Sequence, residues 1–197
     1  MSHQVVDMKC PGCGAPLDTA QRECKYCHNP VTISTFNSVS AMPMPMLNKY
    51  ACSYEADLRE NPDNPELNKS VAFCYLKLRL YDKALPAFEK AIEANFDDSE
   101  SYFYAAICQL KGKKAFLSLR PAIDKAMEYI DAATSIEPLG IYYYFLAYIK
   151  QDYFARKHLN TSPNWQEVLQ TAVNIGLSQT DVDQLYQILG VERPAGL

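Results

Sequence analysis

Residues 65–98, PELNKSVAFCYLKLRLYDKALPAFEKAIEANFDD, decide the fold of this chain. Apolar and small residues recur along them at the 3.6-residue period of an α-helix, in two runs separated by a short polar break. The first run holds Val71, Ala72, Tyr75 and Leu78, and the second holds Ala84, Leu85, Phe88, Ala91 and Ile92. The pattern predicts two amphipathic helices whose alanines permit close approach. Because so short a pair cannot bury its apolar side alone, we also expect neighbouring helices.

This segment resembles a tetratricopeptide repeat (TPR), a helix–turn–helix unit of 34 residues that stacks on its neighbours. The signature positions of the repeat are occupied by Val71, Ala72, Tyr75, Tyr81, Ala84, Phe88 and Ala91. Three residues depart from the pattern, which prefers Trp at Asn68, Gly at Arg79 and Pro at Phe96. The resemblance implies a mainly α fold, a superhelix of TPR-like α-hairpins. An unrelated helical hairpin is the alternative.

Further helical patterns follow and precede the central repeat. Periodicity predicts helices over 49–61 and 178–190 and helical pairs over 99–138 and 139–176. The pair over 99–138 fits the repeat only with an insertion, which contains four cations: Lys111, Lys113, Lys114 and Arg120. This basic insertion at 111–120 is either a solvated, lengthened hairpin loop or a contact loop for an acidic partner.

Two CxxC pairs near the N-terminus carry the clearest chemical signal. Cys10 and Cys13 form the first pair, and Cys24 and Cys27 the second. Four thiolates at this spacing are typical of a tetrahedral Zn²⁺ site, so we expect one structural zinc ion. Gly14 and His28 follow the two pairs, where a left-handed residue lets the chain leave each turn. The spacing predicts a small β-type zinc ribbon over residues 1–34.

The ribbon would depend on its metal, because so short a segment cannot supply a sufficient apolar core. Iron shares the same four-sulfur ligand set, so Zn²⁺ and iron both remain candidates for the bound ion. Thiol oxidoreductase chemistry is a further alternative, although such CxxC motifs normally lie on a βαβ framework that this sequence lacks.

A proline- and methionine-rich segment separates the ribbon from the helical region. Residues 42–46 read MPMPM, and alternating prolines favour extended backbone. We therefore expect three parts: the ribbon over 1–34, an extended and mobile linker over 35–48, and a TPR-like domain with a C-terminal capping helix over 49–197.

Composition limits the classes of partner. The 197-residue chain has a formal net charge of −4, which argues against nucleic acid as a partner. No signal peptide is visible, and no apolar run reaches the roughly 18 residues of a membrane-spanning helix. Without a secretory signal, the seven cysteines favour a reducing compartment, so we expect a cytoplasmic protein.

The TPR resemblance also implies where a protein or peptide partner would bind. In that family the first helix of each repeat lines a concave groove. Carried over to this sequence, the groove residues include Lys69, Phe73, Lys77, Phe103, Ile107, Lys111 and Tyr143. Such an apolar groove should be covered in a soluble monomer, either by a partner or by the helix over 178–190.

No catalytic constellation is visible, since the three histidines lack helically spaced carboxylates and no phosphate loop or nucleophile motif occurs. We expect a non-catalytic, zinc-binding adaptor or scaffold. The alternative is a nucleic-acid-associated or transcription-accessory factor that uses the ribbon or the C-terminal hairpin. Residues Ala172, Gly176, Val182 and Leu185 have helix-turn-helix spacing, but Asp181 and Asp183 would repel phosphates there.

Overall fold

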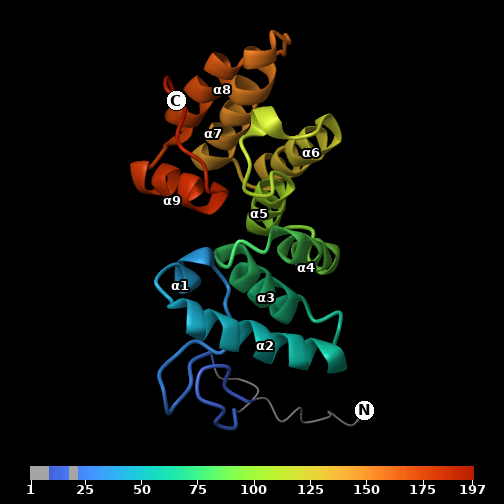
Figure 1. The fold of residues 1–197 in the computed structure, drawn as a ribbon, viewed down its shortest axis with the longest axis vertical. Helices are drawn as coiled ribbons and strands as arrows, with labels where there is room; N and C mark the ends of the chain where they lie inside the picture. The colour runs from blue at the N-terminus through green and yellow to red at the C-terminus, as the bar shows by residue number, and fades with distance from the viewer. Residues whose placement is uncertain (1–8, 18–21) are drawn as a thin grey trace. The chain divides into compact units, whose positions relative to one another are not determined.

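The computed structural model describes residues 9–17 and 22–197 and divides the chain into two compact units, one ending at Ala94 and one starting at Asn95 (Figure 1). Both units are helical, as the sequence predicts. The helices of the first unit are α1 (Phe36–Ser40), α2 (Met44–Glu60), α3 (Pro65–Lys77) and α4 (Tyr81–Ala94).

The second unit contains the remaining α-helices and three short helical turns. Its elements are α5 (Ser99–Gln109), η1 (Ala115–Leu117), α6 (Arg120–Ile136), α7 (Gly140–Ile149), η2 (Lys150–Phe154), η3 (Ala155–Lys157), α8 (Trp165–Ile175) and α9 (Gln179–Leu189). The predicted helical pairs thus correspond to α5 with α6 and to α7 with α8. Within the described residues, no helix has the length and apolar character needed to cross a membrane.

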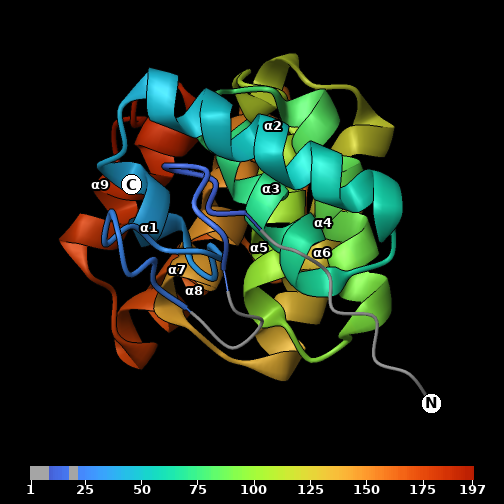
Figure 2. The ribbon, with the colours of Figure 1, turned by 90° about the horizontal axis from the view of Figure 1, so that it is seen from below.

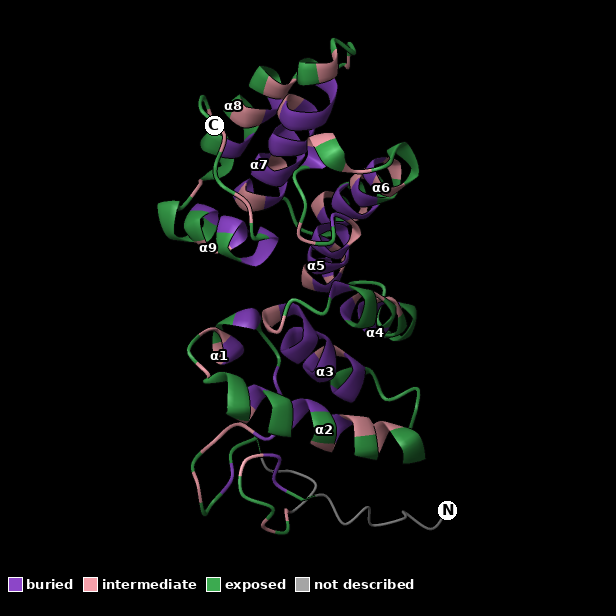
Figure 3. Ribbon diagram, in the orientation of Figure 1, coloured by how far each residue is buried: buried purple, intermediate pink, exposed green. Residues whose placement is uncertain are grey.

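Helices α3 and α4 form the predicted central hairpin. The Asn64 side chain caps α3 by accepting a hydrogen bond from the Leu67 N–H at 3.1 Å, and Pro65 takes the first turn, where a missing N–H costs least. The helix ends at Lys77, and Arg79 just beyond its C-cap has a φ of 59°, the left-handed conformation that the repeat usually gives to glycine. Figure 3 shows α3 buried along most of its length.

Asn68, which replaces the tryptophan of the repeat pattern, is explained by the turn before α3. Its side-chain amide is buried and donates to the carbonyls of Pro62 and Asn64, both at 2.9 Å. These bonds satisfy two carbonyl groups of the α2–α3 connection. The Asn68 amide donates both hydrogen bonds, whereas the indole ring of tryptophan has a single N–H.

The expectation of an extended linker over 35–48 is wrong, because the segment is largely helical. Pro43 lies at the N-cap of α2 and Pro45 within its first turn, where prolines are compatible with a helix. Phe36 of α1 is buried, and its ring packs edge-on against Phe73 with centroids 6.5 Å apart. Phe36, Val39 and Leu47 of this segment therefore belong to the core of the first unit.

The predicted β-type ribbon over 1–34 lies partly outside the described residues, and strands are not seen in the part that is described. Among residues 9–17 and 22–197, extended pairing is limited to two isolated antiparallel bridges, Lys9 with Pro16 and Glu23 with Pro30. Each bridge closes the base of one CxxC turn. The segment is thus a pair of knuckles without strands in its described residues.

In the second unit, α9 packs against α7 through aromatic side chains. The rings of Tyr144 and Tyr186 meet edge-on at 6.2 Å, and their hydroxyls are 3.2 Å apart. Tyr148 meets the same Tyr186 ring at 5.7 Å. The C-terminal helix therefore covers the face of α7 that carries Tyr144 and Tyr148, while Tyr143, the groove position predicted on this helix, stays half-buried.

Candidate functional site

The two CxxC turns are built alike, fourteen positions apart in the sequence. The Cys10 N–H donates to Ala15 and the Gly14 N–H donates back to Cys10, both at 2.8 Å. The second turn repeats these bonds at 2.9 Å between Cys24 and residues 28–29. Two identical turns that face each other give each pair of sulfurs the same local geometry, as a symmetric four-ligand site requires.

Left-handed residues close both turns, as the sequence predicts. Gly14 has a φ of 77° and His28 a φ of 55°. The His28 Nδ1 lies 3.3 Å from the Glu23 carboxylate, and both side chains are largely exposed. His28 is therefore a turn residue and lies outside the metal-binding cluster.

The four sulfurs lie together in a geometry that could hold one metal ion. All four are within 4.8 Å of one another. The Cys10 and Cys27 sulfurs are 3.6 Å apart, as are those of Cys13 and Cys24. A disulfide would bring two sulfurs to about 2 Å, whereas a tetrahedral ion with bonds of about 2.3 Å separates its ligands by about 3.8 Å. The observed spacing fits tetrahedral coordination.

Backbone N–H groups surround the sulfurs and favour their ionised form. The N–H groups of Cys27 and Tyr26 lower the pKa of the Cys24 thiol to about 6. Burial instead raises the pKa of Cys10 to about 12, although the N–H groups of Cys13 and Gly12 act in the opposite direction. Four adjacent thiolates repel one another, so a cation among them is what allows all four to ionise together.

The cysteine cluster is attached to the helices of the first unit, because the chain that follows it is hydrogen-bonded to α2 and α3 (Figure 1 and Figure 2). The Tyr50 and Tyr54 hydroxyls donate to the carbonyls of Pro30 and Val31, both at 2.8 Å. Ser70 Oγ accepts the Ile33 N–H at 2.9 Å and donates to the Ile33 carbonyl at 3.1 Å. The chain after the cluster is therefore anchored to the helices by side-chain hydrogen bonds, and no extended tether separates them.

Burial completes this attachment. Val31 and Ile33 are buried, as are the rings of Tyr50 and Tyr54 that hold the chain beside them. A Cβ added to Gly12 would lie 3.4 Å from the Tyr50 hydroxyl and 3.5 Å from the Cys27 sulfur. Tyr50 thus touches the knuckles directly beneath the cluster.

Sequence reasoning found the four cysteines but missed the side chains that anchor them. Tyr50 and Tyr54 are recognisable as the apolar face of a helix, yet nothing local shows that their hydroxyls reach a loop twenty or more residues away. The one available signal was the alternation of Val31 and Ile33 with polar neighbours. That alternation indicates a segment with one buried face.

The residues expected to line a partner groove divide into two groups. Phe73, Phe103 and Ile107 are buried. The ring of Phe73 packs against Phe36 and Phe88, and that of Phe103 against Tyr142 and Phe145. These apolar residues belong to the cores of their own units, so their assignment as partner anchors is corrected. The remaining four, Lys69, Lys77, Lys111 and Tyr143, keep contact with solvent.

The C-terminal helical pair keeps its acidic character in the structure. Asp181 and Asp183 are both exposed at the start of α9, whereas Val182 and Leu185 are buried. A helix with this surface presents carboxylates where a DNA-reading helix needs cations. Exposure of these two aspartates thus reinforces the charge argument against a helix-turn-helix role.

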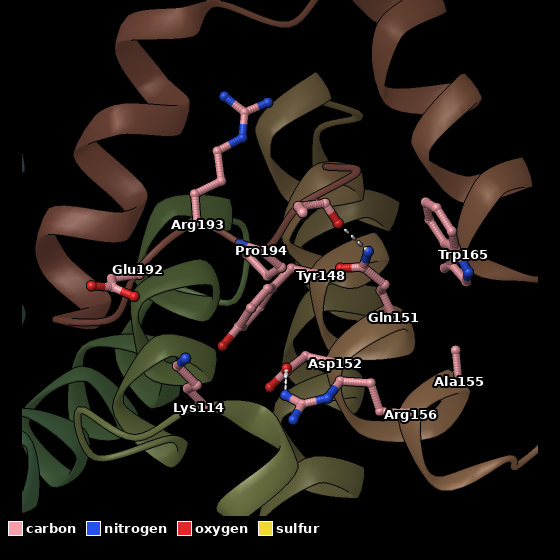
Figure 4. Close-up of a pocket in the computed structure, with 11 residues that line it drawn as sticks. Lys114, Tyr148, Gln151, Asp152, Ala155, Arg156, Trp165, Glu192, Arg193 and Pro194 are labelled. Atoms are coloured by element: carbon pink, nitrogen blue, oxygen red, sulfur yellow. Dashed lines mark hydrogen bonds and ion pairs between the residues drawn. The ribbon is translucent and has the colours of Figure 1, made fainter.

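The second unit contains a hollow of about 520 Å³ between η2, α8 and the residues after α9 (Figure 4). Its charged groups are partly paired, since Arg156 bonds to Asp152 at 2.5 Å. Gln151 donates to the Ala195 carbonyl at 3.2 Å, while its Oε1 is buried without a hydrogen-bond partner in the described structure. The sequence did not predict this hollow, because its residues come from separate segments.

Comparisons with known proteins place the fold. No family model matches the chain, and no curated protein matches its sequence. Among solved structures, MamA MSR-1 C2, a TPR-like protein, superposes with a TM-score of 0.51 at 18% identity, covering 66% of this chain and 67% of its own. At this identity the likeness concerns the fold alone. The chain therefore has a mainly α, TPR-like fold with a four-cysteine cluster.

Proposed function

We propose that this protein is a non-catalytic scaffold that binds protein partners and contains one structural Zn²⁺ ion. The observation that carries the proposal is the combination of a TPR-like helical fold with four cysteine sulfurs placed for tetrahedral coordination. TPR-like surfaces bind polypeptides, and a closed four-sulfur site has no open position for a substrate.

The metal's role in this proposal is structural. When bound, Zn²⁺ would be held by Cys10, Cys13, Cys24 and Cys27 and would neutralise their thiolates. The knuckles would then keep their shape while Tyr50 holds them on α2. A scaffold of this kind uses the metal to fix a surface, and the reducing compartment expected from the sequence would keep the thiols available.

Elemental analysis of purified full-length protein tests the metal directly. We expect one zinc per chain and less than a tenth as much iron. Protein with correctly folded helices and neither metal would contradict the structural site, and stoichiometric iron would correct the identity of the ion.

Crosslinking in the native cell, followed by purification and mass spectrometry, tests the scaffold. We expect a small set of proteins that remains after nuclease treatment. A result in which all captured proteins disappear with nuclease would contradict the scaffold and favour a nucleic-acid-associated role.

A further inference from the structure

The basic insertion of the second unit presents an exposed, positively charged surface. Lys111, Lys113, Lys114 and Arg120 are all exposed in a chain whose net charge is −4. Arg120 pairs with Asp124 at 2.7 Å. For Lys113 and Lys114, by contrast, no ion pair occurs within residues 9–17 and 22–197. Two lysine charges are therefore available to a partner.

Two leucines are exposed in the same loop. Leu117 is 66% exposed and Leu119 78% exposed. Apolar side chains this exposed are favourably removed from water when a partner covers them. Together with the buried Leu110 and with Lys111 and Lys113, they line a hollow of about 500 Å³.

The loop that presents these leucines is fixed in place. The Ala115 N–H donates to the Tyr148 hydroxyl at 3.2 Å, and the Phe116 N–H donates to the buried Asp152 carboxylate at 2.8 Å. The Arg156 guanidinium covers the Phe116 ring at 4.3 Å. A rigid backbone that holds apolar side chains outward loses little conformational entropy when a partner binds.

We propose that this surface, residues 110–122, binds an acidic peptide segment that contains an apolar anchor residue. The anchor enters the hollow between Leu117 and Leu119, and flanking carboxylates meet Lys113 on its lining and the adjacent exposed Lys114, whose side chain lines the other hollow. This inference rests on the scaffold function and names the chemistry of its partner. Both parts of the surface are needed, since the leucines supply affinity and the lysines supply selectivity for negative charge.

Two other anionic partners fit the geometry less well. A bilayer surface takes up an amphipathic helix with a continuous apolar face, whereas Leu117 and Leu119 belong to a three-residue helical turn and the loop after it. Single-stranded nucleic acid binds through exposed aromatic rings, yet Phe116 is covered by Arg156. Of these three anionic partners, an acidic peptide fits best, because one of its apolar side chains can fill a hollow of this size.

Selection from a random 12-residue peptide library, with the full-length zinc-loaded protein as bait, tests the inference. We expect enriched peptides in which Asp or Glu flanks Leu or Phe. Lys113→Glu with Lys114→Glu, and separately Leu117→Ser with Leu119→Ser, should each weaken a selected peptide at least tenfold. Raising the salt concentration should weaken binding to the wild type but hardly affect the lysine variant.

Matched control variants make the same kinds of change in charge and hydropathy at exposed positions outside residues 110–122. Lys49→Glu with Lys90→Glu alters exposed lysines of the first unit, and Val173→Ser removes an exposed apolar side chain of α8. Both should leave peptide affinity within twofold of the wild type. Far-UV circular dichroism of every variant checks that loss of binding does not come from unfolding.

Three results would overturn the inference. The first is enrichment of peptides without acidic residues, and the second is equal binding by folded loop variants. The third is tighter binding to phosphatidylserine vesicles or to single-stranded RNA than to any selected peptide, with loss in the same variants. If crosslinked partners persist in the folded loop variants while peptide binding fails, the scaffold stands and only this surface is wrong.

Discussion

The two units of the molecule cover the faces of their helices in different ways. In the first unit, an irregular chain after the four cysteines is held on α2 and α3 by side-chain hydrogen bonds from Tyr50, Tyr54 and Ser70. In the second unit, the covering element is a helix, α9, which meets α7 through tyrosine rings.

The difference follows from where each covering segment finds its backbone hydrogen bonds. A helix satisfies its own N–H and carbonyl groups and needs only an apolar face to dock. An irregular segment needs partners for those groups and a separate constraint on its shape. We infer that the metal cluster supplies this constraint in the first unit, whereas the second unit needs no ion.

Loss of the metal should have the largest effect, and it should be confined to the first unit. Metal binding supplies on the order of 10 kcal/mol in small four-ligand sites. We therefore expect Cys10→Ser with Cys24→Ser to lower the temperature of the first unit's thermal transition more than any other change proposed here and to leave the second unit's transition in place, measured by scanning calorimetry.

Cys52→Ser is the matched control, because Cys52 is exposed and lies outside the cluster. It should shift neither transition. Equal loss of both transitions in the double variant would contradict the independence of the two units.

Removal of the ring that attaches α9 should have the next largest effect. Tyr186→Ala deletes a buried aromatic side chain and should lower the stability of the second unit by about 3 kcal/mol. Tyr186→Phe keeps the ring and loses only the hydroxyl contact with Tyr144, so it should cost about 1 kcal/mol. Urea unfolding in the presence and absence of chelator measures both changes in stability. A change that depends on metal would contradict the independence of the second unit from the cluster.

Ser70 should couple the docked chain to the metal. Ser70→Ala leaves a buried N–H and carbonyl of Ile33 without their partner and should cost about 2 kcal/mol in the zinc-loaded protein. In the chelated protein the same change should cost much less, because the segment is already detached. Equal costs with and without metal would show that docking does not depend on the cluster.

Helix ends should give the smallest effects, one in each unit. Arg79 and Lys111 adopt left-handed backbone at the ends of α3 and α5, with φ of 59° and 50°. Arg79→Gly should stabilise only the first unit and Lys111→Gly only the second, each by about 0.5–1 kcal/mol. Calorimetry with resolved transitions measures both, and stabilisation of the opposite unit would be inconsistent with separate cores.

Local sequence patterns predicted the parts of this molecule that depend on local interactions. The helices follow from apolar periodicity, and the four-cysteine cluster follows from CxxC spacing. The left-handed conformation of Gly14 and His28 follows from their position after each pair. The helices and the left-handed turns are fixed by residues within one or two turns of each other, and the cluster joins two such turns that lie close in the sequence.

The parts that failed depend on contacts between distant segments. The MPMPM run suggested extended chain, but Pro43 and Pro45 lie where a helix starts, and the buried Phe36 and Leu47 tie the segment to the core. The groove assignment failed at Phe73 because α1 packs against the same face. No local pattern showed that α1 would exist, so the ring's burial could not be foreseen.

We infer that the metal cluster holds the first unit's docked chain in place, while the second unit is independent of the cluster. Hydrogen exchange of the full-length protein, zinc-loaded and metal-stripped, tests this most directly. We predict that stripping removes protection from α2 and the start of α3 but leaves α7 and α9 unchanged. Unchanged protection of α2 after confirmed zinc removal, or equal loss in α7, would contradict the account.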